Sequence, residues 1–352
     1  MTTLWDTCGT EVVKALAAAR NNGGSMTSGL ALTFVVVAEE KDVEPAERAA
    51  SSAAAMHPCR LVVVVRRDPL GNTPRLDAEV TIGGRLGPGE ALELRMYGRL
   101  SLHAESVVLP LLAPDAPVVT WWPGVAPDTL ATDGLGVFAD RRVTDADAAP
   151  DPISALRQRA LDYAPGDTDL AWTRITQWRS ILATAADAAG GAGRMVTIVG
   201  AEVNGSDNSA SAALLAGWLT SRLGADVPIT SPGQGTAIDA AGIAGVRLDL
   251  AELPSIQVNR RDGVGVVSQE GRPASSAALT ERDTGELLGE ELRRLDIDEL
   301  YCGALEGATN SRNLSGRSPT RSLVWQDPAT PDRKPPGAKR IAAAKSGSPS
   351  AS

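Results

Sequence analysis

The sequence predicts an α/β protein, or a mixed α+β one, with two lobes that each contain a mixed sheet and flanking helices. The 352 residues are 43% apolar and 22% charged, which is typical of a globular chain long enough for two domains. Short apolar runs rich in β-branched residues alternate with helical stretches. A segment rich in Asp, Ala and Pro at 145–152 separates a first series of such elements from a second, and it marks the boundary between the lobes.

The first lobe, residues 1–150, opens with a β-α-β unit. The run 35–37 is all valine, and the run 61–65 is apolar on both faces, as in a central parallel strand. Pro45 suits the first turn of the helix between them. In order, the expected elements are a helix at 10–20, a strand at 30–38, a helix at 45–56, a strand at 61–65, a hairpin of strands at 76–82 and 91–97, a helix at 99–109 and a strand at 117–122.

Residues 151–190 are expected to form a helical connector, with helices at 153–163 and 167–189. In the second helix the apolar residues lie on one broad arc, so one face should be buried. The second lobe, 191–306, then repeats the order of strand, helix, several strands and helix, which suggests an internal duplication. Its expected strands are at 195–199, 246–250, 256–260 and 264–268, and its expected helices are at 209–223, 280–294 and 297–305.

The net charge of −9 is unevenly distributed along the chain. Eight Arg and Lys and two Asp give residues 307–352 a charge of +6, which leaves −15 on the rest. The acidic body disfavours binding to nucleic acid. The Ser, Pro, Gly and Lys content of 307–352 predicts a basic, mostly disordered tail.

Cysteine and histidine usage gives no sign of a metal centre or a disulfide framework. The three cysteines, Cys8, Cys59 and Cys302, lie far apart, and there are only two histidines. No short motif specifies catalytic residues or a cofactor site, such as a dinucleotide fingerprint or a hydrolase nucleophile elbow. The first residues do not resemble a secretion signal, and no apolar run approaches the roughly 18 residues of a membrane span. A cytoplasmic protein without a membrane segment is therefore expected.

A loop at Gly200–Ser206 is expected between a strand and a helix, where a phosphate-binding loop would lie. It lacks the lysine of the nucleotide triphosphatase motif. Backbone amides at Gly205 and Ser206 are candidates for holding a small anion at the start of the helix. The alternative is an ordinary capped helix start, since Ser, Asp and Asn are preferred there.

Tryptophan is the most informative residue type, because seven Trp stand beside only three Tyr and two Phe. Two indoles end an apolar strand, and two more lie with arginines on the connector. Trp and Arg are enriched at the hot spots of protein interfaces, so both groups are candidate partner-binding residues, and burial in the core is the open alternative for each. The candidates are Trp121 and Trp122 on the strand, and Trp172, Arg174, Trp178 and Arg179 on the connector.

Five short segments carry a resemblance to a known family through their sequence, order and spacing. They are His57–Arg60, Val107–Leu112, Trp121–Gly124, Asp169–Arg174 and Ala213–Leu219. Together they resemble the OpcA family of glucose-6-phosphate dehydrogenase assembly proteins of actinobacteria and cyanobacteria. The resemblance runs from about residue 4 to residue 305 and leaves out the tail.

The resemblance implies a non-enzymatic allosteric activator that binds glucose-6-phosphate dehydrogenase, promotes its active oligomer and raises flux into the oxidative pentose phosphate pathway of carbohydrate metabolism. It implies no catalytic, cofactor-binding or metal-binding residues, and it allows a homo-oligomer of the chain within the complex. Cyanobacterial relatives are linked to thioredoxin control through cysteines, which is doubtful here because no two cysteines are close in sequence. The competing function is a sugar-phosphate-binding enzyme or sensor that uses the loop Gly200–Ser206.

Overall fold

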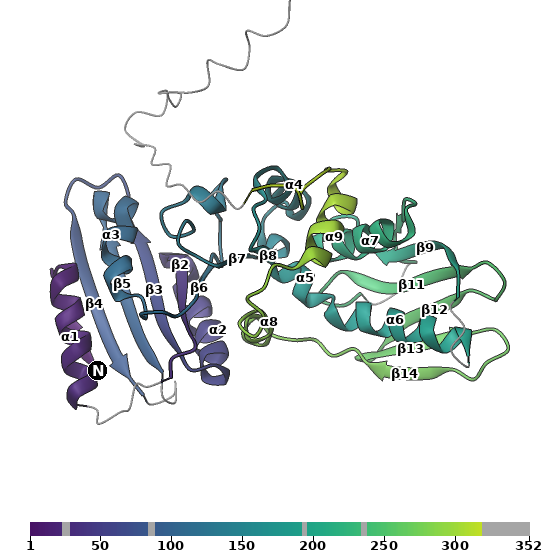
Figure 1. The fold of residues 1–352 in the computed structure, drawn as a ribbon, viewed down its shortest axis with the longest axis horizontal. Coiled ribbons are helices and arrows are strands. Elements are labelled where there is room, and N and C mark those ends of the chain that lie inside the picture. The colour runs from purple at the N-terminus through teal and green to yellow at the C-terminus, as the bar shows by residue number, and fades with distance from the viewer. Residues whose placement is uncertain (23–28, 84–88, 192–195, 234–237, 319–352) are drawn as a thin grey trace, which may run out of the picture.

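The structure, a computed structural model, describes residues 1–22, 29–83, 89–191, 196–233 and 238–318. Two lobes lie side by side, one with an eight-stranded sheet and one with a six-stranded sheet, and helices pack against both (Figure 1). This confirms the predicted mixed α/β class with two lobes. None of the helices in the described ranges is long and apolar enough to cross a membrane.

The first sheet has the strand order β1-β4-β5-β3-β2-β6-β7-β8, and its strands from β5 to β8 are parallel. The valine-rich β2 and β3 are buried on both faces, as predicted, and β4 and β5 form the expected antiparallel pair. From β2 the chain winds outward in both directions, so the topological switch falls between β2 and β6. The strands are β1 (Thr2–Leu4), β2 (Leu32–Glu39), β3 (Cys59–Arg67), β4 (Arg75–Ile82), β5 (Glu90–Tyr97), β6 (Val118–Trp121), β7 (Arg141–Thr144) and β8 (Asp167–Asp169).

Helices cover both faces of this sheet. One face packs against α1 (Gly9–Asn22) and the short α3 (Ala104–Val108). The predicted helix at 99–109 is wrong in detail: α3 is flanked by 3₁₀ turns at Gly98–His103 and Leu109–Leu111, because Pro110 cannot continue an α-helix.

The opposite face packs against α2 (Val43–Met56) and also against α8 (Thr284–Glu291), a helix that follows the second sheet in the chain. Leu287, Leu288 and Leu292 join the same buried cluster as Phe34 and Trp121. In Figure 1, α8 lies beside α2 at the junction of the lobes. The chain therefore returns to the first lobe after it has built the second sheet.

The segment predicted as one helix at 167–189 contains three elements. After α4 (Pro152–Asp162), the chain forms β8 in the first sheet, then α5 (Leu170–Arg174) and α6 (Thr176–Gly190). The helix is interrupted at Ile175, which has φ −90° and ψ 7°. The side chain of Asp169 caps α5 by accepting a hydrogen bond from the amide of Ala171. The first sheet thus extends to Asp169, beyond the predicted lobe boundary at residue 150.

The second sheet has the order β10-β9-β11-β12-β13-β14, and all its pairs are antiparallel except β10 with β9. Since the first sheet is largely parallel, the two lobes do not repeat one topology, and the suggested duplication is not supported. In the second sheet, strand β9 begins at Ile198. The strand predicted at 195–199 begins at residue 195, which lies outside the described residues. The strands are β9 (Ile198–Gly205), β10 (Ile229–Thr230), β11 (Ile243–Leu250), β12 (Ile256–Arg261), β13 (Val264–Gln269) and β14 (Ser275–Ala278).

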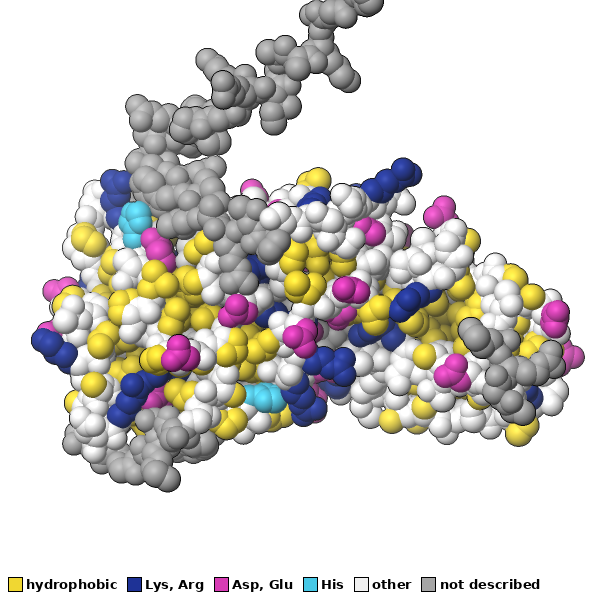
Figure 2. All heavy atoms as spheres, viewed as in Figure 1, with side chains coloured by type: hydrophobic (Ala, Val, Ile, Leu, Met, Phe, Trp, Pro, Cys, Tyr) yellow, Lys and Arg dark blue, Asp and Glu magenta, His cyan; other side chains and the backbone are white. Residues whose placement is uncertain are grey.

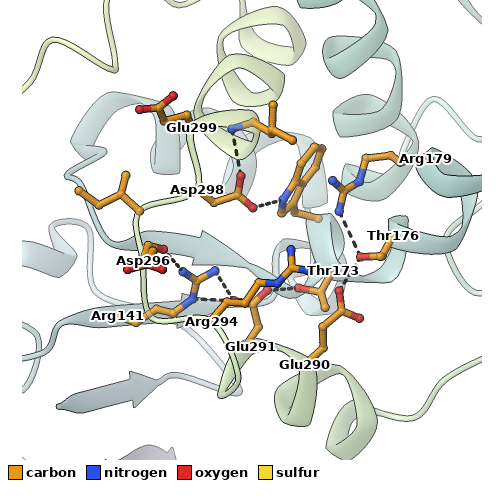
Figure 3. A pocket seen from close by; sticks show the side chains of 13 residues that line it. Arg141, Thr173, Thr176, Arg179, Glu290, Glu291, Arg294, Asp296, Asp298 and Glu299 are labelled. Carbon is orange, nitrogen blue, oxygen red and sulfur yellow. Dashed lines mark hydrogen bonds and ion pairs between the residues drawn. The ribbon is translucent and has the colours of Figure 1, made fainter. Parts of the chain in front are cut away.

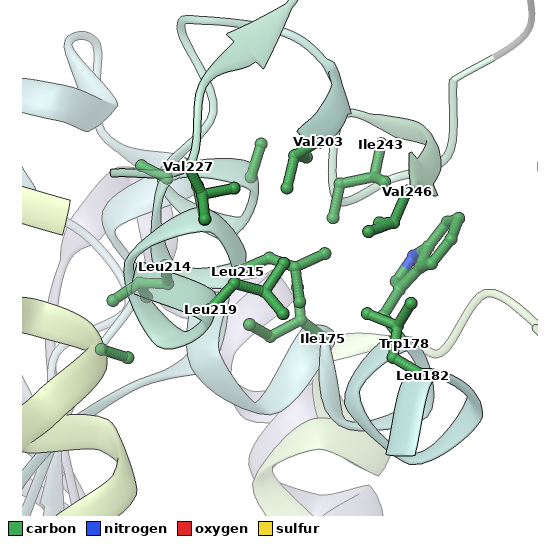
Figure 4. Packing of buried hydrophobic residues seen from close by; sticks show 14 of the residues in the cluster. Ile175, Trp178, Leu182, Val203, Leu214, Leu215, Leu219, Val227, Ile243 and Val246 are labelled. Atoms are coloured by element: carbon green, nitrogen blue, oxygen red, sulfur yellow. The ribbon is translucent and has the colours of Figure 1, made fainter. Parts of the chain in front are cut away.

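One face of the second sheet is covered by α6 and α7 (Ala210–Leu223), and α9 (Glu299–Thr309) packs on α7. Figure 4 shows Trp178 and Leu182 of α6 pointing toward Leu215 of α7 and Val246 of β11. This cluster is the core of the second lobe. The first residues of the predicted tail, 307–352, belong to this lobe, because α9 runs to Thr309 and Leu314 is fully buried. Residues 319–352 lie outside the described residues.

Glycine is needed where α7 crosses α9. A Cβ atom on Gly217 would lie 2.2 Å from the carbonyl oxygen of Ala304, so the two backbones are in contact there. Gly217→Ala is expected to lower the free energy of unfolding by about 1–3 kcal/mol, because the helices must separate to admit the methyl group. Urea unfolding measures the change.

The matched control is Gly303→Ala on α9, where the nearest atom to a new Cβ is Ser221 Oγ at an ordinary 3.5 Å. It should not destabilise the protein, because alanine favours helix by about 1 kcal/mol over glycine. Equal midpoints for Gly217→Ala and the wild type would contradict the close helix crossing.

Candidate functional site at the junction of the two lobes

The indoles of Trp121 and Trp122 are buried, with 2% and 1% of their surface exposed. Adjacent strand residues point to opposite faces, so the two rings lie in different cores. Trp121 stacks on Phe34 at 6.3 Å between ring centroids, and Trp122 packs with Leu130 and Leu135 on the other face. The exposed aromatic rim expected from the sequence is therefore wrong, and the alternative of core burial holds.

Trp172 and Trp178 are also buried, each with 1% of its surface exposed. The Trp172 indole donates to Asp298 Oδ2 at 2.8 Å, and the Trp178 indole donates to Asp239 Oδ2 at 2.8 Å. Both rings thus have their polar atom satisfied inside the protein, which is what a buried indole requires. The connector face expected to meet a partner is packed against this chain instead.

The predicted anion site at Gly205 and Ser206 lies at the end of a strand and not at the start of a helix. The segment 198–205 is strand β9, paired with β11, and the Ser206 amide donates to the Gly242 carbonyl at 2.8 Å. The start of α7 comes only at Ala210. The Ser206 amide is therefore paired within the chain at the end of β9 and does not form an anion cradle with Gly205.

The start of α7 does hold an anion, the carboxylate of Asp147 from the first lobe. Asp147 Oδ1 accepts from the Ala210 amide at 2.7 Å and the Ser211 amide at 3.3 Å. A carboxylate is stabilised at a helix N-terminus by the unpaired amides and the helix dipole. Arg174 joins the same network through ion pairs to Asp147 at 3.0 Å and Asp145 at 2.9 Å. Arg174, a predicted partner-binding residue, is therefore part of the contact between the two lobes.

A third carboxylate, Asp169, lies beside this network. It accepts from Thr144 Oγ1 at 2.6 Å and from the Ala146 and Ala171 amides at 3.0 and 2.9 Å. Burial, and then the nearby Asp145 carboxylate, raises the pKa of Asp169 to about 6. The hydrogen bonds compensate much of the cost of burying this group.

A pocket of about 410 Å³ opens where the lobes meet (Figure 3). Figure 2 shows acidic and basic side chains side by side over this junction. The pocket is lined by both lobes, and two of the predicted residues, Trp172 and Arg179, belong to it. The Arg179 guanidinium lies 3.6 Å from the centre of the Trp172 ring, and burial lowers the pKa of Arg179 to about 10.

Most acidic groups of the pocket are held by partners within the chain. Arg141 Nε donates to Glu291 Oε2 at 2.6 Å, and Thr173 donates to the other oxygen of Glu291. The Asp298 carboxylate accepts from the Trp172 indole and from the first amides of α9. In the described residues no group of three or more His, Cys, Asp or Glu has a geometry that could hold a metal ion. The pocket is a polar junction in which charges stabilise the packing of the lobes.

The sequence reasoning missed Arg141, Glu291 and Asp147. One signal was available: Arg141 and Arg142 form a pair within a strand, and both are buried. Two arginines in a central strand need buried carboxylates, which Glu291 and Asp167 supply. Glu291 follows by 150 residues, so its role depends on the path of the chain and not on a local pattern.

A second cavity of about 450 Å³ lies at the carboxyl ends of the parallel strands, by the switch between β2 and β6. Dinucleotides bind at such a crevice when a glycine-rich turn follows the first strand. Here Glu40 and Asp42 follow β2, and a Cβ on Gly124 would lie 2.5 Å from Asp42 Oδ2. The turn after β2 is therefore acidic and contains no glycine, unlike the phosphate-binding turn of dinucleotide folds.

Two family models match the chain: the glucose-6-phosphate dehydrogenase subunit N-terminal domain over residues 50–161 and the corresponding C-terminal domain over residues 165–305. Their boundary falls between the end of α4 and the start of β8. No curated protein sequence matches the chain significantly.

Similar solved structures include UDP-N-acetylglucosamine 3-dehydrogenase GnnA from Acidithiobacillus ferrooxidans, with 9% identity and a TM-score of 0.39 over 80% of this chain and 96% of that one. An oxidoreductase from Sinorhizobium meliloti has 10% identity and a TM-score of 0.35 over 84% of this chain and 99% of that one.

The two family models match in the expected order and together span residues 50 to 305. The chain therefore belongs to the OpcA family of glucose-6-phosphate dehydrogenase assembly subunits.

Proposed function

We propose that the chain is a non-enzymatic assembly factor and allosteric activator of glucose-6-phosphate dehydrogenase. It binds the dehydrogenase in the cytoplasm, favours its active oligomer and thereby raises flux through the oxidative pentose phosphate pathway. The observation that carries this proposal is the match of both subunit domains along the chain.

The junction of the lobes supports such a role. An activator must bind the active state of its target more tightly than the inactive one, because equal affinity shifts no equilibrium. A rigid binding surface makes that difference large, since little is lost in ordering it. Asp147, in the segment after β7, is bound to Arg174 of α5 and to the start of α7, and Glu291 links Arg141 of β7 to Thr173 of α5. These contacts hold the two lobes in a fixed arrangement.

The structure does not support the site on which the competing sugar-phosphate function rested. That function requires a phosphate loop at Gly200–Ser206, and these residues instead pair within the second sheet. The crevice of the first lobe also carries Asp42 where a phosphate would approach. Both features favour a protein that acts by contact.

The proposal is tested by titrating the chain into purified dehydrogenase while both the activity and the oligomer mass are measured. We expect the activity to rise together with the fraction of the larger assembly, and to saturate at a fixed ratio of the two chains. The chain alone, supplied with glucose 6-phosphate and nicotinamide cofactor, should show no turnover. An unchanged activity and an unchanged mass would refute the proposal.

A further inference from the structure

Among the described residues, one corner of the first sheet is only partly covered on the side where α2 and α8 pack. The corner consists of β1, β4 and β5, whose other face is buried against α1. Along β5, buried and partly exposed residues alternate, and the partly exposed set includes Glu93, Arg95 and Tyr97. Of the described helices, α2 reaches this face through Glu47, beside Glu93, which keeps 17% of its side-chain surface exposed, whereas Arg95 keeps 34%. A partly exposed antiparallel face of this kind can meet another protein.

Trp5 lies at the edge of this corner with 67% of its surface exposed. The other five indoles in the described part of the chain are buried or only partly exposed. Leu4 is the last residue of β1 and pairs with Ala78, so Trp5, just beyond the strand, lies near Asp77 of β4. The Asp6 amide donates to Asp77 Oδ1 at 2.9 Å, which fixes the chain just beyond the indole.

The corner also carries Tyr97 between two arginines. The guanidinium carbons of Arg67 and Arg75 each lie 5.4 Å from the centre of the Tyr97 ring. Both arginines are paired within the chain, Arg67 with Glu40 and Arg75 with Asp77. Trp, Tyr and Arg are the residue types enriched at interface hot spots.

Negative charge at the corner is not fully compensated. Glu47 of α2, Glu79 of β4 and Glu93 of β5 lie close together, and Arg95 forms an ion pair with Glu93. Burial, and then the Glu93 carboxylate, raises the pKa of Glu47 to about 7, while Arg95 opposes this shift. A cationic side chain placed here would relieve the repulsion among the carboxylates.

We propose that this corner is the surface on which a basic segment of the dehydrogenase docks, with an arginine or lysine among Glu47, Glu79 and Glu93 and an apolar contact on Trp5. The identity of the partner rests on the proposed function, whereas the charge of its segment rests on the corner itself. A second copy of this chain fits poorly, because a face-to-face pair would bring two acidic clusters together.

The test measures binding of the full chain to purified dehydrogenase at low and moderate salt, for the wild type, Trp5→Ala and Glu79→Lys. Each variant should weaken binding at least tenfold at low salt, and the deficit of Glu79→Lys should shrink as salt rises because the attraction it removes is screened. The matched control is Leu161→Ala on α4, which removes another exposed apolar side chain, with 72% of its surface exposed, and should bind like the wild type. Circular dichroism melts verify that all variants are folded.

The outcomes separate the two proposals. Wild-type binding together with undiminished binding of Trp5→Ala and Glu79→Lys would overturn the docking surface and leave the assembly function standing. Failure of the wild type to bind would overturn both. If the variants instead change the mass of the chain on its own, the corner is an interface between copies, and the assignment to the dehydrogenase is wrong.

Discussion

Glu291→Ala is expected to lower the free energy of unfolding by about 3–5 kcal/mol, as loss of one partner of a buried ion pair does. The Glu291 side chain is 6% exposed, and it links Arg141 of the first lobe to Thr173 of α5. Its removal leaves the Arg141 guanidinium, 4% exposed, without a carboxylate among the described residues, although the Asp296 carbonyl still accepts from it at 2.9 Å. Urea unfolding followed by circular dichroism measures the loss.

The control is Glu44→Ala, which removes an exposed ion pair with Arg48 on α2. That pair is solvated on both sides, so its loss should cost about 0.5 kcal/mol. The double variant Arg141→Ala with Glu291→Ala should lose less than the sum of the single variants, because no unpaired charge is left behind. A loss below about 1 kcal/mol for Glu291→Ala would contradict the buried bridge.

Trp121→Ala is expected to cost about 3–5 kcal/mol of stability, because it opens a cavity in the core between the first sheet and its helices. The ring is 2% exposed and packs in one cluster with Phe34 and with Leu287 of α8. Thermal unfolding should show a large fall in midpoint. At temperatures where the variant is folded, its activation of the dehydrogenase should match that of the wild type.

Trp5→Ala provides the contrast, since the same residue type is removed from an exposed position. Its melting midpoint should stay near that of the wild type, while its binding to the dehydrogenase falls. The reverse pattern, with a stable Trp121→Ala that no longer activates, would restore the hypothesis of an exposed anchor at this position.

Local patterns predicted the regular parts of the fold well. The runs of valine in β2 and β3 have no polar face, and this is a direct consequence of burial on both sides of a parallel sheet. The capping residues Ser209 and Asp298 begin α7 and α9 close to the predicted positions. In these elements the conformation of each residue is determined mainly by residues close to it in the sequence.

Prediction failed where distant residues decide the structure. Asp167–Asp169 is helix-compatible in sequence, yet it forms a strand because β7 offers a free edge beside it. Gly200–Ser206 is rich in small and polar residues, which favours a loop, but pairing with β11 makes residues 200–205 part of a strand. Neither partner can be recognised from the segment itself.

The candidate site was predicted only in part. Trp172 and Arg179 do line the junction pocket, but Trp and Arg on an amphipathic helix can pack inside the protein as readily as they meet a partner. Asp147 and Glu291 were missed because their partners lie 63 and 150 residues away. Trp5 was overlooked because exposure of an indole is a property of the folded surface and leaves no local pattern.

The return of α8 to the first lobe means that neither family domain is a self-sufficient module. A fragment cut between residues 161 and 165 would lack Leu287, Leu288 and Leu292, and it would leave an unfilled apolar trough along α2 and β6. The two halves share this core, so neither half is expected to fold alone, and both should unfold in one cooperative transition.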